Sequence, residues 1–268
     1  MQHEMHLFIL ASGSKGNAAV VEGPDGSVLI DCGISRRQLF ARANEVGCNL
    51  EHVKAVVVTH EHGDHTAGLK VLRYGEHTPV LITEKTASRR ELFSKLPCQF
   101  IDNNQRIHIA GMQIDFFSTS HDVADPIGMR FSTAHDAIGF CTDTGYLPDE
   151  ARQLLKDTRV LALEANHDTK MLEAGPYPRR LKQRVGGDYG HLSNDQAAHA
   201  LKELIGSNCE TVVAMHLSEQ NNTIRTCMKT LADALGATVD PHDCGHAVLG
   251  DHNLELWVAY QDMPRVFL

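Results

Sequence analysis

Apolar residues in this chain gather in short runs rich in Val, Ile and Leu, and glycine-containing turns separate the early runs. Short β-branched runs bounded by turn residues are typical of strands. The run at residues 53–59 is almost continuously apolar, which predicts a strand buried on both faces. The predicted strands are residues 7–10, 18–21, 28–30, 53–59, 80–83, 107–110, 113–118, 128–132, 138–142, 160–163 and 211–214.

Helical spacing of apolar residues appears between these strands. One such segment begins at Ser35, a suitable N-cap, and ends before Gly47, a suitable stop. The predicted helices are residues 35–46, 84–95, 149–156, 194–205 and 223–235. Early strands, intervening helices and a later group of strands predict two β-sheets packed face to face with helices outside. No linker or repeat interrupts the pattern, so we expect one domain over residues 1–268.

Histidine changes this picture most, because the chain has 17 of them and imidazole both binds metals and transfers protons. The seven cysteines form no C-x-x-C pair, which predicts reduced thiols rather than a cysteine zinc site. The formal charge of −9 disfavours the wrapping of long duplex DNA on a broad basic face. No secretory pattern opens the chain and no apolar run reaches about 18 residues, so we expect a cytoplasmic protein without membrane contact.

The densest group of metal-binding residue types is the motif H-E-H-G-D-H, which directly follows the buried strand predicted above. His60 and His62 are two residues apart, so in extended backbone their side chains leave on the same side and can bind one cation. We expect Gly63 to let the chain turn and present Asp64 and His65 to a second cation. Four nitrogen and oxygen donors in so short a segment suit zinc or a similar divalent ion.

This motif resembles the signature of the metallo-β-lactamase fold superfamily, and later residues match that family in the expected order. Asp31, which follows the strand at 28–30, resembles the early aspartate that supports the metal loop. The resemblance implies an αββα sandwich and two bound divalent ions, zinc by preference, with manganese or iron as alternatives. The implied ligands are His60, His62 and His121 for the first metal, Asp64, His65 and His216 for the second, and Asp143 as the bridge.

Four further segments resemble the YycJ/WalJ-like branch of that superfamily, which is related to ribonuclease Z and whose members are regarded as 5′-to-3′ exonucleases. They are LASGSKGNA at 10–18, LEANHD at 163–168, GHLSN at 190–194 and HLSEQNN at 216–222. By resemblance to ribonuclease Z, Glu164 pairs with His191, and His191 protonates the leaving oxygen. Here His191 lies in Gly-His-Leu-Ser instead of Gly-His-Ser-Thr. The implied catalytic residues are Asp64, Glu164 and His191.

Basic residues just before His191 indicate where phosphates bind. A basic run in an otherwise acidic chain can hold flanking phosphates, although it is equally typical of a solvated helix face. A lysine in a glycine-rich turn is a further candidate, without the spacing of a P-loop. The predicted substrate-binding residues are Lys15, Arg179, Arg180, Lys182 and Arg184. Asp31 and His167 are expected to support the site without contacting the metals.

Together these features predict a dinuclear metal-dependent phosphodiesterase and, by the family resemblance, a 5′-to-3′ exonuclease on DNA with a role in repair. The acidic charge favours contacts with single-stranded DNA. Cleavage of a phosphodiester expels an alkoxide, for which a proton donor such as His191 is useful. The alternatives are a thioester, lactone or β-lactam hydrolase with the same metal cage, and a non-catalytic binding protein on this fold. The sequence identifies no protein partner.

Overall fold

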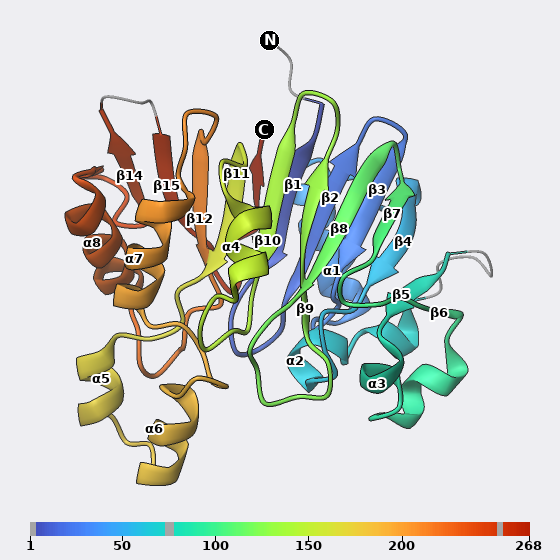
Figure 1. Ribbon diagram of the computed structural model, residues 1–268, viewed down its shortest axis with the longest axis horizontal. Helices are drawn as coiled ribbons and strands as arrows, with labels where there is room; N and C mark the ends of the chain where they lie inside the picture. Colours follow the sequence, from blue (N-terminus) through green and yellow to red (C-terminus); the bar gives the residue numbers. More distant parts are fainter. Residues whose placement is uncertain (1–3, 73–77, 251–253) are drawn as a thin grey trace. The chain divides into compact units, whose positions relative to one another are not determined.

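The computed structural model describes residues 4–72, 78–250 and 254–268, whose contacts divide into two compact units (Figure 1). Unit 1 comprises Met1–Ser118, Val123–Ala137 and Tyr260–Leu268, and unit 2 comprises Thr119–Asp122 and Ile138–Ala259. The expectation of a single domain over residues 1–268 stays a prediction. Within the described ranges, no helix combines the length and the apolar character needed to cross a bilayer.

A seven-stranded sheet forms the centre of unit 1, in the order β16-β1-β2-β3-β4-β5-β6. Neighbours from β16 to β3 are antiparallel, and neighbours from β3 to β6 are parallel. The strands are β1 (His6–Ala11), β2 (Ala18–Gly23), β3 (Gly26–Ile30), β4 (Val53–Val57), β5 (Val80–Ile82), β6 (Cys98–Phe100) and β16 (Arg265–Phe267). Because β3 and β4 are parallel, Asp31 and Thr59 follow their strands at the same edge of the sheet.

Both faces of this sheet are covered within unit 1. Leu29 of β3 shares an apolar cluster with Leu39 of the first helix, whereas Val28 faces the opposite side and is buried as well. On that side a Cβ at Gly23 would lie 2.5 Å from Met112 Cγ, so β2 packs directly against β8. The covering elements are α1 (Arg36–Glu45), η1 (Leu50–His52), α2 (Gly63–Thr66), η2 (Leu69–Val71), α3 (Glu84–Ala87), η3 (Glu91–Lys95), β7 (Arg106–Ile109), β8 (Met112–Ser118) and β9 (Ile127–Ser132).

The centre of unit 2 has the strand order β10-β11-β12-β15-β14-β13, of which β10 to β15 are parallel neighbours and the last two pairs antiparallel. Helices α7 and α8 contact each other, and α8 lies against β15 (Figure 1). The elements are β10 (Ala137–Cys141), α4 (Asp149–Leu155), β11 (Val160–Glu164), α5 (Thr169–Ala174), α6 (Arg179–Val185), α7 (Asn194–Leu204), β12 (Thr211–Met215), α8 (Ile224–Leu235), β13 (Thr238–Val239), β14 (His246–Leu249) and β15 (Leu254–Val258). Parallel strands end at one edge, which gathers Asp143, Glu164 and His216 there.

Every predicted strand is present, with ends that differ by at most two residues, but the helix predicted at 84–95 is wrong. Helix α3 ends at Ala87, and η3 begins only after Arg90, whose backbone is extended. The Arg90 guanidinium donates hydrogen bonds to the Glu61 carbonyl and the Thr66 hydroxyl. This tertiary contact outweighs the helical propensity of the segment.

Candidate metal centre

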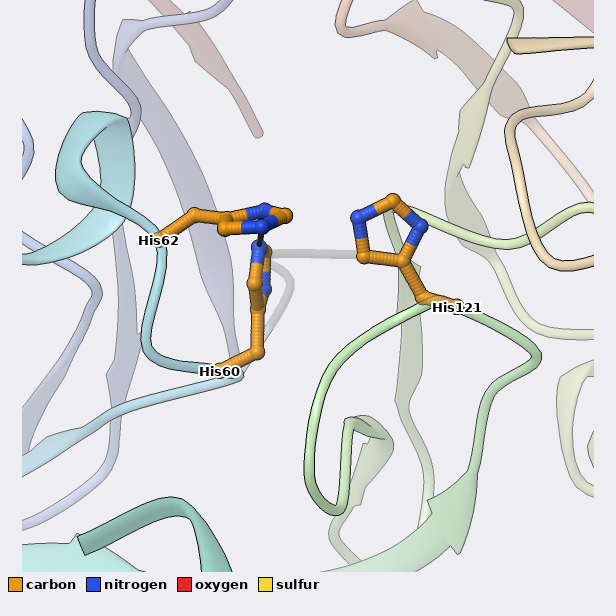
Figure 2. Close-up of side chains that lie close together, drawn as sticks. All are labelled: His60, His62 and His121. Carbon is orange, nitrogen blue, oxygen red and sulfur yellow. Dashed lines mark hydrogen bonds between the residues drawn. The ribbon is translucent and has the colours of Figure 1, made fainter. Parts of the chain in front are cut away.

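Unit 1 carries the H-E-H-G-D-H motif in the segment that follows β4 and runs into the first residues of α2. The Thr59 hydroxyl donates its single hydrogen to Asp31 Oδ2 at 2.7 Å. In its contact of 3.0 Å with His60 Nδ1, the hydroxyl oxygen is therefore the acceptor and the imidazole is the donor. His60 Nε2 then lies 3.2 Å from His62 Nδ1, and the two rings meet edge to face (Figure 2). Two ring nitrogens that converge in this way can present lone pairs to one cation. Figure 2 also draws His121, which belongs to unit 2 and is described below.

Asp31 anchors the same loop from the end of β3. Its Oδ1 accepts a hydrogen bond from the Thr59 backbone at 2.8 Å, and its Oδ2 accepts one from His65 Nδ1 at 2.7 Å. Because Nδ1 of His65 donates to Asp31, the Nε2 atom carries the lone pair that a metal would use. The carboxylate therefore orients the imidazole, and its support of a bound metal stays a prediction.

Asn17 is a candidate that sequence reasoning missed. Its backbone N–H donates to the Asp64 carbonyl at 2.7 Å, and its Nδ2 lies 3.1 Å from His65 Nε2 and 3.4 Å from Asp64 Oδ2. Gly16 before it has a φ of 143°, a conformation that glycine adopts readily. The Gly-Asn dipeptide in the sequence could have indicated this role, because glycine permits a positive φ and the asparagine side chain can form hydrogen bonds. Asn17 thus positions Asp64 and His65.

Gly33 leaves no room for a side chain beside the metal loop. A Cβ at this residue would lie 1.5 Å from the Asp64 carbonyl oxygen. We expect Gly33→Ala to displace the Asp64 backbone. The substitution should lower the free energy of unfolding by about 1–3 kcal/mol and reduce the metal content of the protein. Urea unfolding and metal analysis of the purified protein measure the two effects.

Gly63→Ala in the same loop is the matched control. Gly63 begins α2, its φ is not positive, and a Cβ there would meet nothing within 4 Å. The expectation that Gly63 turns the chain through its conformational freedom is therefore wrong, since the first turn of α2 makes the bend. Alanine at Gly63 should not lower the free energy of unfolding, and equal losses in the two variants would contradict the steric argument.

Arg90 holds both ends of the loop. Its Nη1 donates to the Glu61 carbonyl at 3.1 Å and to the Thr66 hydroxyl, which itself donates to the His62 carbonyl at 2.8 Å. Because these bonds involve a charged donor, we expect Arg90→Ala to lower the free energy of unfolding by about 1.5–3 kcal/mol. Metal affinity, measured by competition with a chelator, should fall by about 10–100-fold.

The neighbouring Arg89 is exposed and provides the control for Arg90. Arg89→Ala removes the same charge from the same segment without removing the contacts to Glu61 and Thr66. Both the unfolding curve and the chelator titration of Arg89→Ala should match those of the unaltered protein. If Arg90→Ala behaved in the same way, the loop would not depend on this guanidinium.

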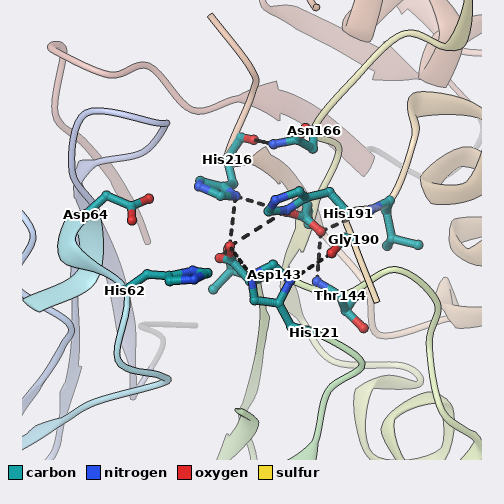
Figure 3. A network of polar contacts seen from close by, with 12 residues as sticks. His62, Asp64, His121, Asp143, Thr144, Asn166, Gly190, His191 and His216 are labelled. Carbon is teal, nitrogen blue, oxygen red and sulfur yellow. Dashed lines mark hydrogen bonds and ion pairs between the residues drawn. The ribbon is translucent and has the colours of Figure 1, made fainter. Parts of the chain in front are cut away.

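Unit 2 brings a second group of imidazoles around Asp143. The Asp143 Oδ1 atom lies 3.5 Å from His216 Nδ1, 3.7 Å from His191 Nδ1 and 3.8 Å from His121 Nε2 (Figure 3). Thr142 donates to the other oxygen, Oδ2, at 2.6 Å. One carboxylate oxygen therefore lies close to three imidazole rings, which places a negative charge at the centre of the group.

Glu164 lies behind these histidines and is fully buried. Its Oε1 accepts hydrogen bonds from His191 Nδ1 at 2.8 Å and from His216 Nδ1 at 2.9 Å. Its Oε2 accepts from the backbone N–H groups of Thr144 at 2.9 Å and Leu192 at 3.1 Å. These four bonds use the acceptor sites of the carboxylate, so Glu164 orients two rings rather than binding a cation itself. Sequence reasoning found its pairing with His191 and missed the one with His216.

The charges of this group act on one another. Burial opposes ionisation of Glu164, but the charges and hydrogen bonds of His191 and His216 outweigh it and lower the pKa of the carboxyl. Burial likewise opposes protonation of His191, but Glu164 and Asp143 outweigh it, and the pKa of this imidazole is raised. In the protonated form, Nδ1–H stays on Glu164 and Nε2–H is available as a donor.

His121 is oriented by a backbone group instead of a carboxylate. Its Nδ1 donates to the Gly190 carbonyl at 2.9 Å, which leaves the Nε2 lone pair on the side of Asp143 (Figure 3). Gly190 directly precedes His191, so one short segment supports both histidines. A Cβ at Gly190 would lie 2.2 Å from the Arg184 carbonyl oxygen, which explains the glycine at this position.

Three of the predicted site residues have left-handed backbone, at a φ of 57° for Asp31, 52° for Asp143 and 56° for His216. This conformation costs an L-residue about 1–2 kcal/mol, although aspartate tolerates it better than most residues. Each of the three follows a strand and turns its side chain toward histidines or a carboxylate described above. Strain of this kind is typical of functional sites.

The residue types of unit 2 fit a divalent metal. Asp143, Glu164, His191 and His216 lie with one donor atom each within 4.8 Å of the others. Because Glu164 holds the two imidazoles and His191 is paired with it, Asp143 and His216 are the members of this group that could bind the metal. Imidazoles with carboxylates suit zinc, and also manganese or iron. A thiolate ligand is disfavoured, because burial and the nearby carboxylates raise the pKa of Cys141 well above its ordinary value.

The predicted substrate-binding residues lie on two surface segments. Lys15 is exposed on the turn between β1 and β2. The remaining four lie on α6, where Arg179 and Arg180 are exposed and Lys182 Nζ donates to the Glu173 carbonyl at 2.6 Å. Arg184 forms an ion pair with Asp122, which anchors α6 beside His121. The helix is thus both solvated and next to the histidine cluster.

His167 is buried behind the second group, next to α6. A Cβ at Gly186 would lie 3.8 Å from His167 Nε2. Burial lowers the pKa of this imidazole, and its Nδ1 has no hydrogen-bond partner among the described residues. Its role in supporting the site stays a prediction.

Comparisons with known proteins identify the family of the chain. Residues 27–217 match the model of the β-lactamase superfamily domain. The chain is 34% identical over 232 residues to exodeoxyribonuclease YycJ of Bacillus anthracis, with 85% of this chain and 86% of that protein covered. It is 33% identical over 236 residues to exodeoxyribonuclease WalJ of Streptococcus pneumoniae, with 85% and 87% covered.

Among solved structures, the metallo-β-lactamase fold protein YhfI from Bacillus subtilis is similar over 98% of this chain and 99% of that one. The TM-score is 0.72 at 17% sequence identity. At this sequence identity the similarity shows a shared fold and nothing about function. The predicted fold class, two mixed β-sheets with helices outside, is confirmed.

Proposed function

The chain belongs to the YycJ/WalJ-like branch of the β-lactamase superfamily, and from that membership we propose that this hydrolase is a 5′-to-3′ exonuclease acting on single-stranded DNA. Two relatives that align over most of their length carry the name exodeoxyribonuclease. The observation that carries the proposal is the bond between His191 and buried Glu164, because it provides the proton donor that an alkoxide leaving group needs.

We propose further that the two groups of imidazoles and carboxylates hold two divalent ions, zinc by preference. His60, His62 and His121 would bind the first ion, and Asp64, His65 and His216 the second, with Asp143 between them. The convergence of His60 and His62, and the positions of His121 and His216 beside Asp143, support this assignment. When bound, such ions activate water and stabilise charge on the attacked phosphorus centre.

The residues of the chain have distinct tasks in this proposal. Asp31 and Glu164 orient the imidazoles of His65 and His216 through Nδ1, so that Nε2 points away from the carboxylate. Glu164 also holds His191, whose Nε2–H donates a proton to the departing oxygen.

The exposed cationic side chains on α6 bind the phosphates that flank the scissile bond. A role in DNA repair and a cytoplasmic location belong to the same proposal.

The test is degradation of single-stranded DNA by protein loaded with zinc, manganese or iron. Substrates labelled at the 5′ end and at the 3′ end distinguish the direction of digestion, and RNA of the same sequence tests the sugar preference. Asp64→Ala controls for a contaminating nuclease. Early release of 5′ mononucleotides by the unaltered protein alone would support the proposal. No cleavage with any of the metals, together with turnover of a thioester or lactone, would replace it by small-molecule hydrolysis.

A further inference from the structure

Two exposed tyrosines lie next to the histidine cluster around Asp143 in unit 2. Tyr146 is 47% exposed and Tyr189 is 66% exposed, and no other large apolar side chain among the described residues of unit 2 is exposed. Tyr146 follows Asp143 by three residues, and Tyr189 precedes His191 by two. Large aromatic faces left in water are typical of binding surfaces.

The backbone holds both tyrosines beside the cluster. The Ser120 carbonyl accepts a hydrogen bond from Gly145 N–H at 2.7 Å, and the Ser120 hydroxyl donates to the Asp188 carbonyl at 2.6 Å. A Cβ at Gly145 would lie 2.3 Å from the Asp188 oxygen, so the two segments are in direct contact. Ser120 precedes His121, and the residue before each tyrosine is therefore fixed next to a predicted ligand.

Further bonds limit the movement of each segment. The Tyr146 carbonyl accepts a hydrogen bond from the Thr144 hydroxyl, and the Gly190 carbonyl after Tyr189 accepts one from His121 Nδ1. Neither phenol hydroxyl, however, bonds to any residue in the described part of the chain. The two phenol groups are thus presented on a fixed backbone, and their hydroxyls have no hydrogen-bond partner among the described residues.

We propose that Tyr146 and Tyr189 form a stacking platform for the unpaired bases of a nucleic acid whose phosphate lies at the histidine cluster. Bases of every kind have an aromatic face, and stacking on tyrosine tolerates any sequence. In a duplex these faces are already covered by neighbouring base pairs, so the platform selects single strands and frayed ends. The exposed Arg179 and Arg180 on α6 add positive charge for the backbone phosphates.

This inference rests on the proposed nuclease function, and it is tested by binding instead of cleavage. Two fluorescent oligonucleotides of about ten nucleotides are compared by anisotropy, with phosphorothioate linkages to resist hydrolysis. One carries bases and the other is abasic throughout, so both present the same charges. We expect the unaltered protein to prefer the base-containing strand by roughly 5–150-fold.

Tyr146→Ala and Tyr189→Ala should each lose much of this preference and bind the abasic strand as the unaltered protein does. Phenylalanine at either position should retain the preference, because the hydroxyl has no partner. Phe100→Ala, which removes a 57% exposed ring from unit 1, is the matched control and should retain it too. Leucine replaces alanine in any variant whose circular dichroism shows incomplete folding.

The outcomes separate the two proposals. If the protein degrades DNA but the alanine variants keep the full preference for bases, the platform is wrong and the nuclease function stands. Equal weakening for both strands would also overturn the platform, because it would indicate loss of structure or of contacts to phosphate. If the unaltered protein neither binds nor degrades any nucleic acid with zinc, manganese or iron, both proposals fail together.

Discussion

Replacing His191 by alanine is expected to lower the rate of DNA hydrolysis by about 10²–10⁴-fold, the usual loss when a general acid is removed, while metal content stays unchanged. His191 donates through Nδ1 to Glu164 at 2.8 Å, and its Nε2 has the role of proton donor in our proposal. Its side chain remains 18% exposed, whereas that of His121 is 1% exposed, so substrate has access to this ring.

Metal analysis and single-turnover cleavage of the same protein sample measure the two quantities. His199→Ala, which removes an exposed histidine from α7, is the matched control and should change neither. A substrate with a good leaving group, such as a nitrophenyl phosphodiester, should lose much less rate than DNA, because its leaving oxygen needs no proton. Loss of metal from the His191 variant would show that this imidazole is a ligand and would remove it from the role of acid.

Asp143→Asn is expected to reduce metal affinity by more than about 100-fold, since changes to residues behind the ligands already cost about 10–100-fold. The Oδ1 atom of Asp143 faces His121, His191 and His216 at 3.5–3.8 Å, so the substitution removes the negative charge shared by three imidazoles. Activity should fall in parallel, because the same ions activate water in the proposed reaction.

Competition with a chelator measures the affinity, and thermal unfolding with and without added zinc measures the coupling of metal to stability. Asp115→Asn is the control, because Asp115 is a buried carboxylate whose partners are Arg106 and Gln113. The stabilisation by zinc should disappear in Asp143→Asn and persist in Asp115→Asn. Unchanged zinc affinity in Asp143→Asn would rule out a bridging role for this carboxylate.

Local patterns in the sequence located most of the candidate site. The loop after β4 was predicted from residue types at fixed spacing, and the short distance between His60 and His62 follows from positions two apart in extended backbone. Asp143 and His216 could be identified as candidate ligands only from the order of ligand residues in the family. A single polar residue after a strand has many ordinary explanations. The structure then showed that both residues have left-handed backbone beside the same cluster.

The supporting contacts were not predictable in the same way. The segment at 84–95 has helical spacing, but its helix is interrupted at Arg90, which donates hydrogen bonds to Glu61 and Thr66. No pattern within residues 84–95 indicates that contact. Asn17 reaches Asp64, 47 residues along the chain, and Glu164 reaches His216, 52 residues along. Such bonds depend on which strand ends meet, and the hydrophobic pattern alone does not determine the order of strands in a sheet.

By itself, the sequence determined eleven of the strands, the helices α1, α4, α7 and α8, the candidate metal-binding loop and the chemical class of its donors, because these depend on residue type and on spacing within a few positions. Only the tertiary structure decided which nitrogen of each imidazole is held, that Glu164 orients two histidines, and that the segments of Tyr146 and Tyr189 contact each other beside the cluster. The reason is that orientation at a site comes from hydrogen bonds between strand ends, and packing brings those ends together across long stretches of chain.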